Sequence, residues 1–194
     1  MLMNPKVAHY ISTFGNPLLT ISVFSVIALF QTESTRNAVF GTLIILGGIV
    51  VPIVIKSYRG VQKGEYTNYD ISNRKQRQSW YLLPTLLLAG VTLILHFTHQ
   101  SRSMQLAVLF ALVLFVMSQV VNIYLKTSLH VGFTVYLAFL IYPLNAVIAV
   151  AVLLFTVILG WSRIVLLRHT LKEVLCGAAL GMLAGSFFLL TLYW

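Results

Sequence analysis

The chain is dominated by long runs of apolar residues that short polar stretches separate. A helix of about 20 apolar residues crosses a bilayer, and the lipid interior requires a backbone whose hydrogen bonds are all internal. The pattern therefore predicts an all-α, polytopic helical membrane protein. We expect six or seven transmembrane helices in a single bundle, formed as one transmembrane domain over residues 1–194. The predicted helices occupy residues 15–31, 37–55, 80–98, 104–125, 129–142, 144–161 and 170–193.

The polar break YPLN separates two apolar runs that are short for a bilayer of roughly 30 Å. Its Pro143 is compatible with a tight turn between two helices or with a kink within one long helix. We favour the turn, because a continuous helix over residues 129–161 would overshoot the membrane.

The only long polar segment covers residues 56–79, and we expect it to form a loop that contributes to the functional site. Gly60 and Gly64 favour irregular structure, since glycine weakens a helix. Ser72 is a suitable cap for a short helix that begins with the residues NRKQR.

Composition agrees with the membrane assignment. Hydrophobic residues make up 59% of the chain, charged residues only 9%, and the mean hydropathy is +0.91, whereas soluble domains carry about 25% charged residues. The single cysteine, Cys176, lies in an apolar run and permits no internal disulfide. The first 17 residues lack the compact apolar core and the cleavage site of a secretory signal, so we expect them to belong to the mature protein.

The net charge of +9 points to an anionic partner. Because the basic residues occupy loops between apolar runs, we expect the bilayer's anionic lipid or a phosphate substrate rather than nucleic acid. The scattered acids form no pair of carboxylates that could hold magnesium. We therefore expect neither a metal nor another cofactor. The four acids are Glu33, Glu65, Asp70 and Glu173.

Seven crossings would put the N-terminus and the loops around 56–79, 126–130 and 162–169 on one face of the membrane. That face would carry eleven of the thirteen Lys and Arg residues, and the opposite face only Arg36 and Arg102. Loops rich in Lys and Arg stay cytoplasmic. We therefore expect a cytoplasmic active-site face, although several of these cations are also candidate ligands.

Three polar clusters share this predicted face: NRKQR at 73–77, KTSLH at 126–130 and SRIVLLRH at 162–169. Cations and hydroxyls without neighbouring acids suit an anion such as phosphate, and the starts of the next helices would add partial positive charge. Two histidines beside a phosphate could attack phosphorus and protonate the leaving alcohol. Glu173, four residues after His169, could accept a hydrogen bond from that imidazole.

SRIVLLRHTLKE at 162–173 resembles the signature S-R-x5-H-x3-D of the type-2 phosphatidic acid phosphatase family, which also includes vanadium haloperoxidases. Ser162, Arg163 and His169 match it in type and spacing. Glu173 stands where the family has Asp, which lengthens the orienting side chain by one methylene.

TSLH resembles the family's P-S-G-H, matching at Ser128 and His130 but carrying Thr127 for Pro and Leu129 for Gly. The first signature, K-x6-R-P, is absent as such. Its nearest counterparts are Arg74, Lys75 and Arg77.

The resemblance implies a metal-independent membrane phosphatase that hydrolyses a lipid phosphomonoester or pyrophosphate, with residues 126–173 as the core of the catalytic signatures. It implies that His169 is the nucleophile that forms a phosphohistidine, that Glu173 orients it and that His130 is the general acid. It also implies that Arg163 and Ser128 bind phosphate. Lys126 and Arg168 adjoin matched residues and are additional candidate phosphate ligands, beside the three cations at 74–77. Phosphatidic acid, phosphatidylglycerol phosphate and polyprenyl pyrophosphate would all present the same group.

Other interpretations stay open. The scaffold could belong to a non-catalytic protein that binds or transports an anionic lipid or a phosphorylated solute. Arg59 and Lys63 could be interfacial anchors. Glu173 could simply pair with Lys172 or Arg168. A vanadate haloperoxidase is disfavoured because those sites lie in soluble helical domains, and oligomeric state leaves no readable signal.

One motif is expected to be scaffold alone. The segment GAALGMLAG has a small residue every four positions, at Gly177, Gly181 and Gly185. That spacing predicts close packing of this helix against a neighbour.

Overall fold

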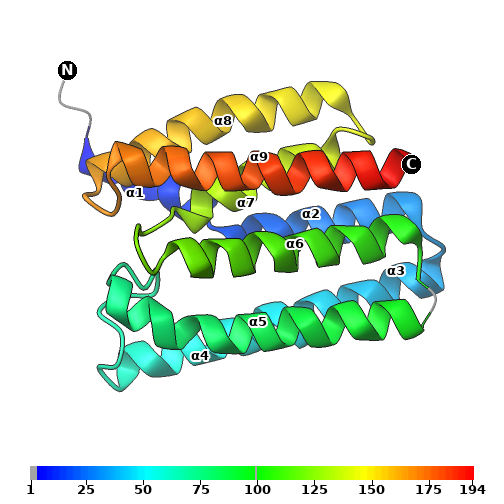
Figure 1. The fold of residues 1–194 in the computed structure, drawn as a ribbon, viewed down its shortest axis with the longest axis horizontal. Coiled ribbons are helices and arrows are strands. Elements are labelled where there is room, and N and C mark those ends of the chain that lie inside the picture. Colours follow the sequence, from blue (N-terminus) through cyan, green and yellow to red (C-terminus); the bar gives the residue numbers. More distant parts are fainter. Residues whose placement is uncertain (1–3, 99) are drawn as a thin grey trace. The chain divides into compact units, whose positions relative to one another are not determined.

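The computed structural model describes residues 4–98 and 100–194 (Figure 1). Within these ranges every regular element is a helix, which confirms the all-α prediction. The elements are α1 (Pro5–Phe14), α2 (Pro17–Thr32), α3 (Thr35–Thr42), the π-helical η1 (Leu43–Val50), α4 (Val51–Gln62), α5 (Arg74–Phe97), α6 (Arg102–Val121), α7 (Leu129–Ile141), α8 (Ala146–Val165) and α9 (Leu171–Tyr193).

The helices are those of a multi-pass membrane protein. Five are long and apolar enough to cross a bilayer: Thr35–Gln62, Arg74–Phe97, Arg102–Val121, Ala146–Val165 and Leu171–Tyr193. A sixth crossing results if α1 and α2, which are bent by 41° at their junction, form one broken span. α7 is apolar but has only 13 residues. Length and composition thus support five or six spans among the described residues. Of the predicted six or seven transmembrane helices, the structure supports at most six.

Two predicted boundaries are wrong at the polar segment 56–79. Residues 56–62 continue α4, and the chain from Arg74 onward belongs to α5, so that irregular structure is confined to 63–73. Lys, Arg and Gln are good helix formers, which lets both helices extend past their apolar parts. The cap of α5 is Asn73 rather than Ser72, and its side chain accepts from the Lys75 amide at 2.9 Å. This helix is also long rather than short.

The helix at the N-terminus was not predicted, because its polar residues interrupt the apolar pattern. Asn4 caps it by accepting from the Lys6 amide at 3.0 Å, and Pro5 occupies its first turn. In contrast, the predicted turn at YPLN is confirmed. α7 ends at Ile141, and α8 begins after Asn145, whose side chain accepts from the Ile148 amide at 3.0 Å.

Contacts between residues divide the chain into two compact units. The first consists of Met1–Ile21 with Val113–Trp194, and the second of Ser22–Leu112. Each unit is described by itself below. The single domain expected over residues 1–194 stays a prediction.

In the first unit, α7 is the central element and packs against both α8 and α9, while α1 packs against α8. The close approach of α7 and α9 depends on glycine. A Cβ added to Gly177 would lie 2.5 Å from the Ser128 carbonyl oxygen, and one added to Gly181 would lie 2.3 Å from that of Gly132. The predicted role of the small residues in helix packing is confirmed, and their contact brings the start of α9 beside the start of α7.

Candidate functional site

His169 lies at the turn between α8 and α9 and is 6% exposed. Its amide and that of Arg168 both donate to the Arg163 carbonyl, at 3.2 and 3.0 Å, so that the end of α8 holds the turn. Leu167 completes the turn in the left-handed region, with φ of 53°. This conformation costs a residue with a Cβ about 1–2 kcal/mol, which the surrounding hydrogen bonds must offset.

Glu173 holds the His169 ring. Its Oε2 lies 3.0 Å from His169 Nδ1, and the predicted hydrogen bond is therefore present. The same carboxylate accepts from the Thr170 amide at 3.1 Å, and the Thr170 hydroxyl accepts from the Glu173 amide at 3.4 Å. This is a capping box at the first turn of α9. Glu173 consequently both caps the helix and orients the imidazole.

Lys126 contacts the turn that carries His169. Its ammonium lies 3.8 Å from Glu173 Oε2 and donates to the Arg168 carbonyl at 2.5 Å. Glu173 thus contacts both His169 and Lys126. A cation in this position pairs with the carboxylate and ties the chain before α7 to the turn that carries His169. Lys126 therefore helps to position this turn, and its part in phosphate binding stays a prediction.

Ser128 marks the start of α7 and is completely buried. Its amide donates to the Glu173 carbonyl at 3.2 Å, which joins the first turn of α7 to that of α9. Its hydroxyl makes no side-chain cap and has no hydrogen-bond partner within the described ranges. A buried hydroxyl without a partner is costly, so an oxyanion beside it would gain a donor that nothing else uses.

His130 lies two residues beyond Ser128, in the first turn of α7, and is 7% exposed. The hydrogen bond between Ser128 and Glu173 thus brings the helix turns that carry His130 and His169 to the same end of the first unit. Two helices, α7 and α9, begin at this end, and their free amides add partial positive charge there.

Arg163 is fully buried in the last turn of α8. One nitrogen of its guanidinium, Nη1, donates to the hydroxyl of Ser12 at 2.5 Å. Ser12 belongs to α1, is itself buried, and was not singled out in the sequence, because nothing in the N-terminal pattern links it to a residue 151 positions away. The hydroxyl holds one side of a buried cation whose desolvation would otherwise be costly.

The cations at the start of α5 belong to the second unit. Arg74 and Lys75 are exposed, whereas Arg77 is 3% exposed and its Nε donates to the Ile71 carbonyl at 3.2 Å. Arg77 thereby holds the polar segment against α5. That these three residues bind phosphate stays a prediction. The same holds for Arg168, which is half-buried and belongs to the first unit.

The arrangement in the first unit suits an oxyanion better than a cation. Over residues 4–98 and 100–194, no three His, Cys, Asp or Glu side chains gather as ligands of a metal ion would. The site instead combines a buried guanidinium, a buried hydroxyl, two imidazoles and two helix starts. Such a set can bind a phosphoryl group and place an imidazole nitrogen against it.

Comparison with models of known protein families, with curated proteins and with solved structures produced no match.

Proposed function

We propose that the chain is a metal-independent integral membrane phosphatase that hydrolyses a lipid phosphomonoester or pyrophosphate through a phosphohistidine intermediate. The observation that carries the proposal is the 3.0 Å contact between His169 Nδ1 and the Glu173 carboxylate. Because an ionised carboxylate only accepts hydrogen bonds, Nδ1 carries the proton in this pair. The lone pair of Nε2 is then available for attack on phosphorus.

In the proposed reaction, Nε2 of His169 attacks phosphorus, and the bond from phosphorus to the bridging oxygen breaks. His130 gives its proton to the departing oxygen. Water then attacks the phosphohistidine, His130 takes the proton of this water, and inorganic phosphate leaves the restored imidazole. Arg163 and the Ser128 hydroxyl bind the nonbridging oxygens.

The surroundings of the pair support this assignment. Lys126 and the Thr170 amide both contact the Glu173 carboxylate, which fixes its direction. The buried Ser128 hydroxyl supplies a donor at the start of α7. The short apolar α7 and the spans around it suit a substrate whose tails stay in the bilayer while its phosphate reaches the turn.

The test is release of phosphate by the purified protein in detergent with a chelator present. The substrates are phosphatidic acid, phosphatidylglycerol phosphate and a polyprenyl pyrophosphate. We expect His169→Ala to abolish both turnover and an acid-labile phosphoenzyme. His130→Ala should slow turnover about 10²–10⁴-fold, since it removes only acid catalysis. The control is His96→Ala, which alters an exposed histidine in the last turn of α5.

Two results would count against the proposal. Phosphate release by His169→Ala at the wild-type rate would exclude the nucleophile. Binding of a lipid phosphate by the wild type without any release would favour the non-catalytic carrier or receptor. A cytoplasmic active site is part of the proposal. It rests on the bias of Lys and Arg toward the face that seven crossings predict, which requires the 13-residue α7 to cross the membrane as well.

A further inference from the structure

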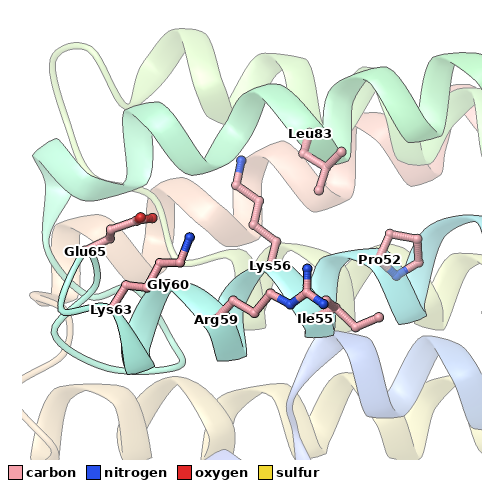
Figure 2. A pocket seen from close by; sticks show the side chains of 8 residues that line it. All are labelled: Pro52, Ile55, Lys56, Arg59, Gly60, Lys63, Glu65 and Leu83. Carbon is pink, nitrogen blue, oxygen red and sulfur yellow. The ribbon is translucent and has the colours of Figure 1, made fainter.

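The second unit contains a pocket of its own, with a volume of about 450 Å³, between the end of α4 and α5 (Figure 2). The pocket is lined by three cations, one carboxylate and an apolar wall. Its lining residues are Pro52, Ile55, Lys56, Arg59, Gly60, Lys63, Glu65 and Leu83. None of them belongs to the first unit, so this pocket shares no residue with the site around His169.

The cations follow one side of α4 to its end. Lys56 and Arg59 are three residues apart on one face of the helix, and Lys63, four residues further on, is its C-cap. Figure 2 shows the ammonium groups of Lys56 and Lys63 extending to the same side. With a single carboxylate among them, the lining carries a formal charge of +2.

Lys56 is held in place rather than free in solvent. Its ammonium donates to the carbonyls of Ser79 and Trp80 in α5, at 3.3 and 3.4 Å. Trp80 in turn donates from its indole nitrogen to the Ser57 hydroxyl at 3.0 Å. The most deeply set cation of the pocket is thereby positioned before any ligand arrives.

The wall of the pocket is apolar toward the bilayer. Pro52 and Ile55 belong to the candidate span Thr35–Gln62, and Leu83 to Arg74–Phe97. The cations lie at the other end, beside the polar segment 63–73. An anionic group bound there would continue into apolar contacts along the spans, which is the polarity of a membrane lipid and not of a soluble anion.

We propose that this pocket binds the headgroup of an anionic phospholipid, with the phosphate on the cations and an acyl chain along the apolar wall. Basic residues at the end of a span attract anionic lipid in any case, at about 1 kcal/mol per charge. The concave arrangement adds a fixed location. Attraction by an interfacial anchor depends on the number of charges alone. Binding at a headgroup site depends on the cations that line the pocket and on the shape of the pocket.

Shape is controlled by Gly60. A Cβ added there would lie 2.2 Å from the ring of Tyr66, which is buried against it. Gly60→Ala must therefore displace Tyr66 together with the segment that carries Lys63 and Glu65. This change alters the pocket without altering any charge.

The experiment measures quenching of Trp80 by phospholipids with brominated acyl chains, in liposomes that contain the protein with Trp161 and Trp194 replaced by Phe. We expect brominated phosphatidylglycerol to quench more strongly than brominated phosphatidylcholine. Arg59→Gln with Lys63→Gln should weaken this preference by at least about tenfold, because each change removes a charge-assisted contact to the phosphate.

The matched control is Arg36→Gln with Arg102→Gln, which removes two exposed cations of the same unit outside the pocket. The preference should survive in this control and in His169→Ala, and it should weaken in Gly60→Ala. Equal losses in the two double variants would reduce the effect to general surface attraction and overturn the proposal. Full competition by inorganic phosphate would also overturn it, since the site would then take a free anion.

Discussion

Gly177 in α9 offers the most direct test of how the first unit is assembled. A Cβ at this position would lie 2.5 Å from the Ser128 carbonyl oxygen and 3.2 Å from its amide nitrogen. In Gly177→Ala, the backbone of α7 must retreat by roughly 0.5–1 Å to restore ordinary contact. The hydrogen bond from the Ser128 amide to Glu173, already 3.2 Å long, would not survive that shift.

The magnitude follows from three contributions. Overpacking costs about 1–3 kcal/mol, and loss of the hydrogen bond about 0.5–1.5 kcal/mol. The higher helix propensity of alanine offsets about 1 kcal/mol. Gly90→Ala is the matched control, because Gly90 lies within α5 and an added Cβ meets nothing within 4 Å. The propensity gain is common to both variants, so their difference isolates the clash at about 1.5–4.5 kcal/mol.

The assay is thermal unfolding in detergent, followed by circular dichroism. At about 2–4 °C per kcal/mol for a chain of this size, Gly177→Ala should unfold about 3–18 °C below Gly90→Ala. Midpoints of the two variants that coincide within a degree would refute the reasoning, since they would mean that the backbones of α7 and α9 are not in contact at Gly177.

Four further changes separate structural from chemical roles. Glu173→Gln should leave the melting temperature nearly unchanged, because glutamine also completes a capping box. Phosphate release should fall by at least about tenfold, because the negative charge beside the imidazole is lost. An unchanged rate would argue against an orienting carboxylate. Ser12→Ala should raise the KM for a lipid phosphate and lower stability by about 1–3 kcal/mol, because it removes an acceptor that the buried Arg163 uses. Restoration of both by Ser12→Thr would identify the hydroxyl as the cause, and a KM unchanged in the alanine variant would contradict this reasoning. Asn145→Ala should cost about 0.5–2 kcal/mol in chemical unfolding through loss of the α8 cap, with an unaltered turnover number. Leu167→Gly should raise the free energy of unfolding by about 1 kcal/mol and the unfolding midpoint with it, because glycine adopts the left-handed conformation without strain. A lower midpoint would show that the exposed leucine side chain stabilises the turn.

Much of the fold could be predicted because it depends on local pattern. Apolar runs identify the spans, and Asn and Pro beside them mark the turn at YPLN. The pairing of His169 with Glu173 could also be predicted from local spacing, since the two residues are four positions apart, although His169 lies in the turn before α9 and not on the helix itself. The failures have a common origin too. The apolar pattern breaks at the basic ends of α4 and α5, although the helical backbone does not, because Lys, Arg and Gln are good helix formers. It also breaks at α1, where the Asn4 cap and Pro5 start a helix that carries polar residues.

The contacts that turn these helices into a candidate site join residues that are distant in the chain. Ser12 meets Arg163 across 151 positions, and Lys126 meets the turn at Arg168 across 42. Hydropathy and spacing specify which face of a helix is apolar, but they do not specify which helix it packs against or how closely. That choice belongs to side-chain fit. The glycines of α9 let it touch the backbone of α7, and the packing of α1 against α8 brings the Ser12 hydroxyl to the buried Arg163.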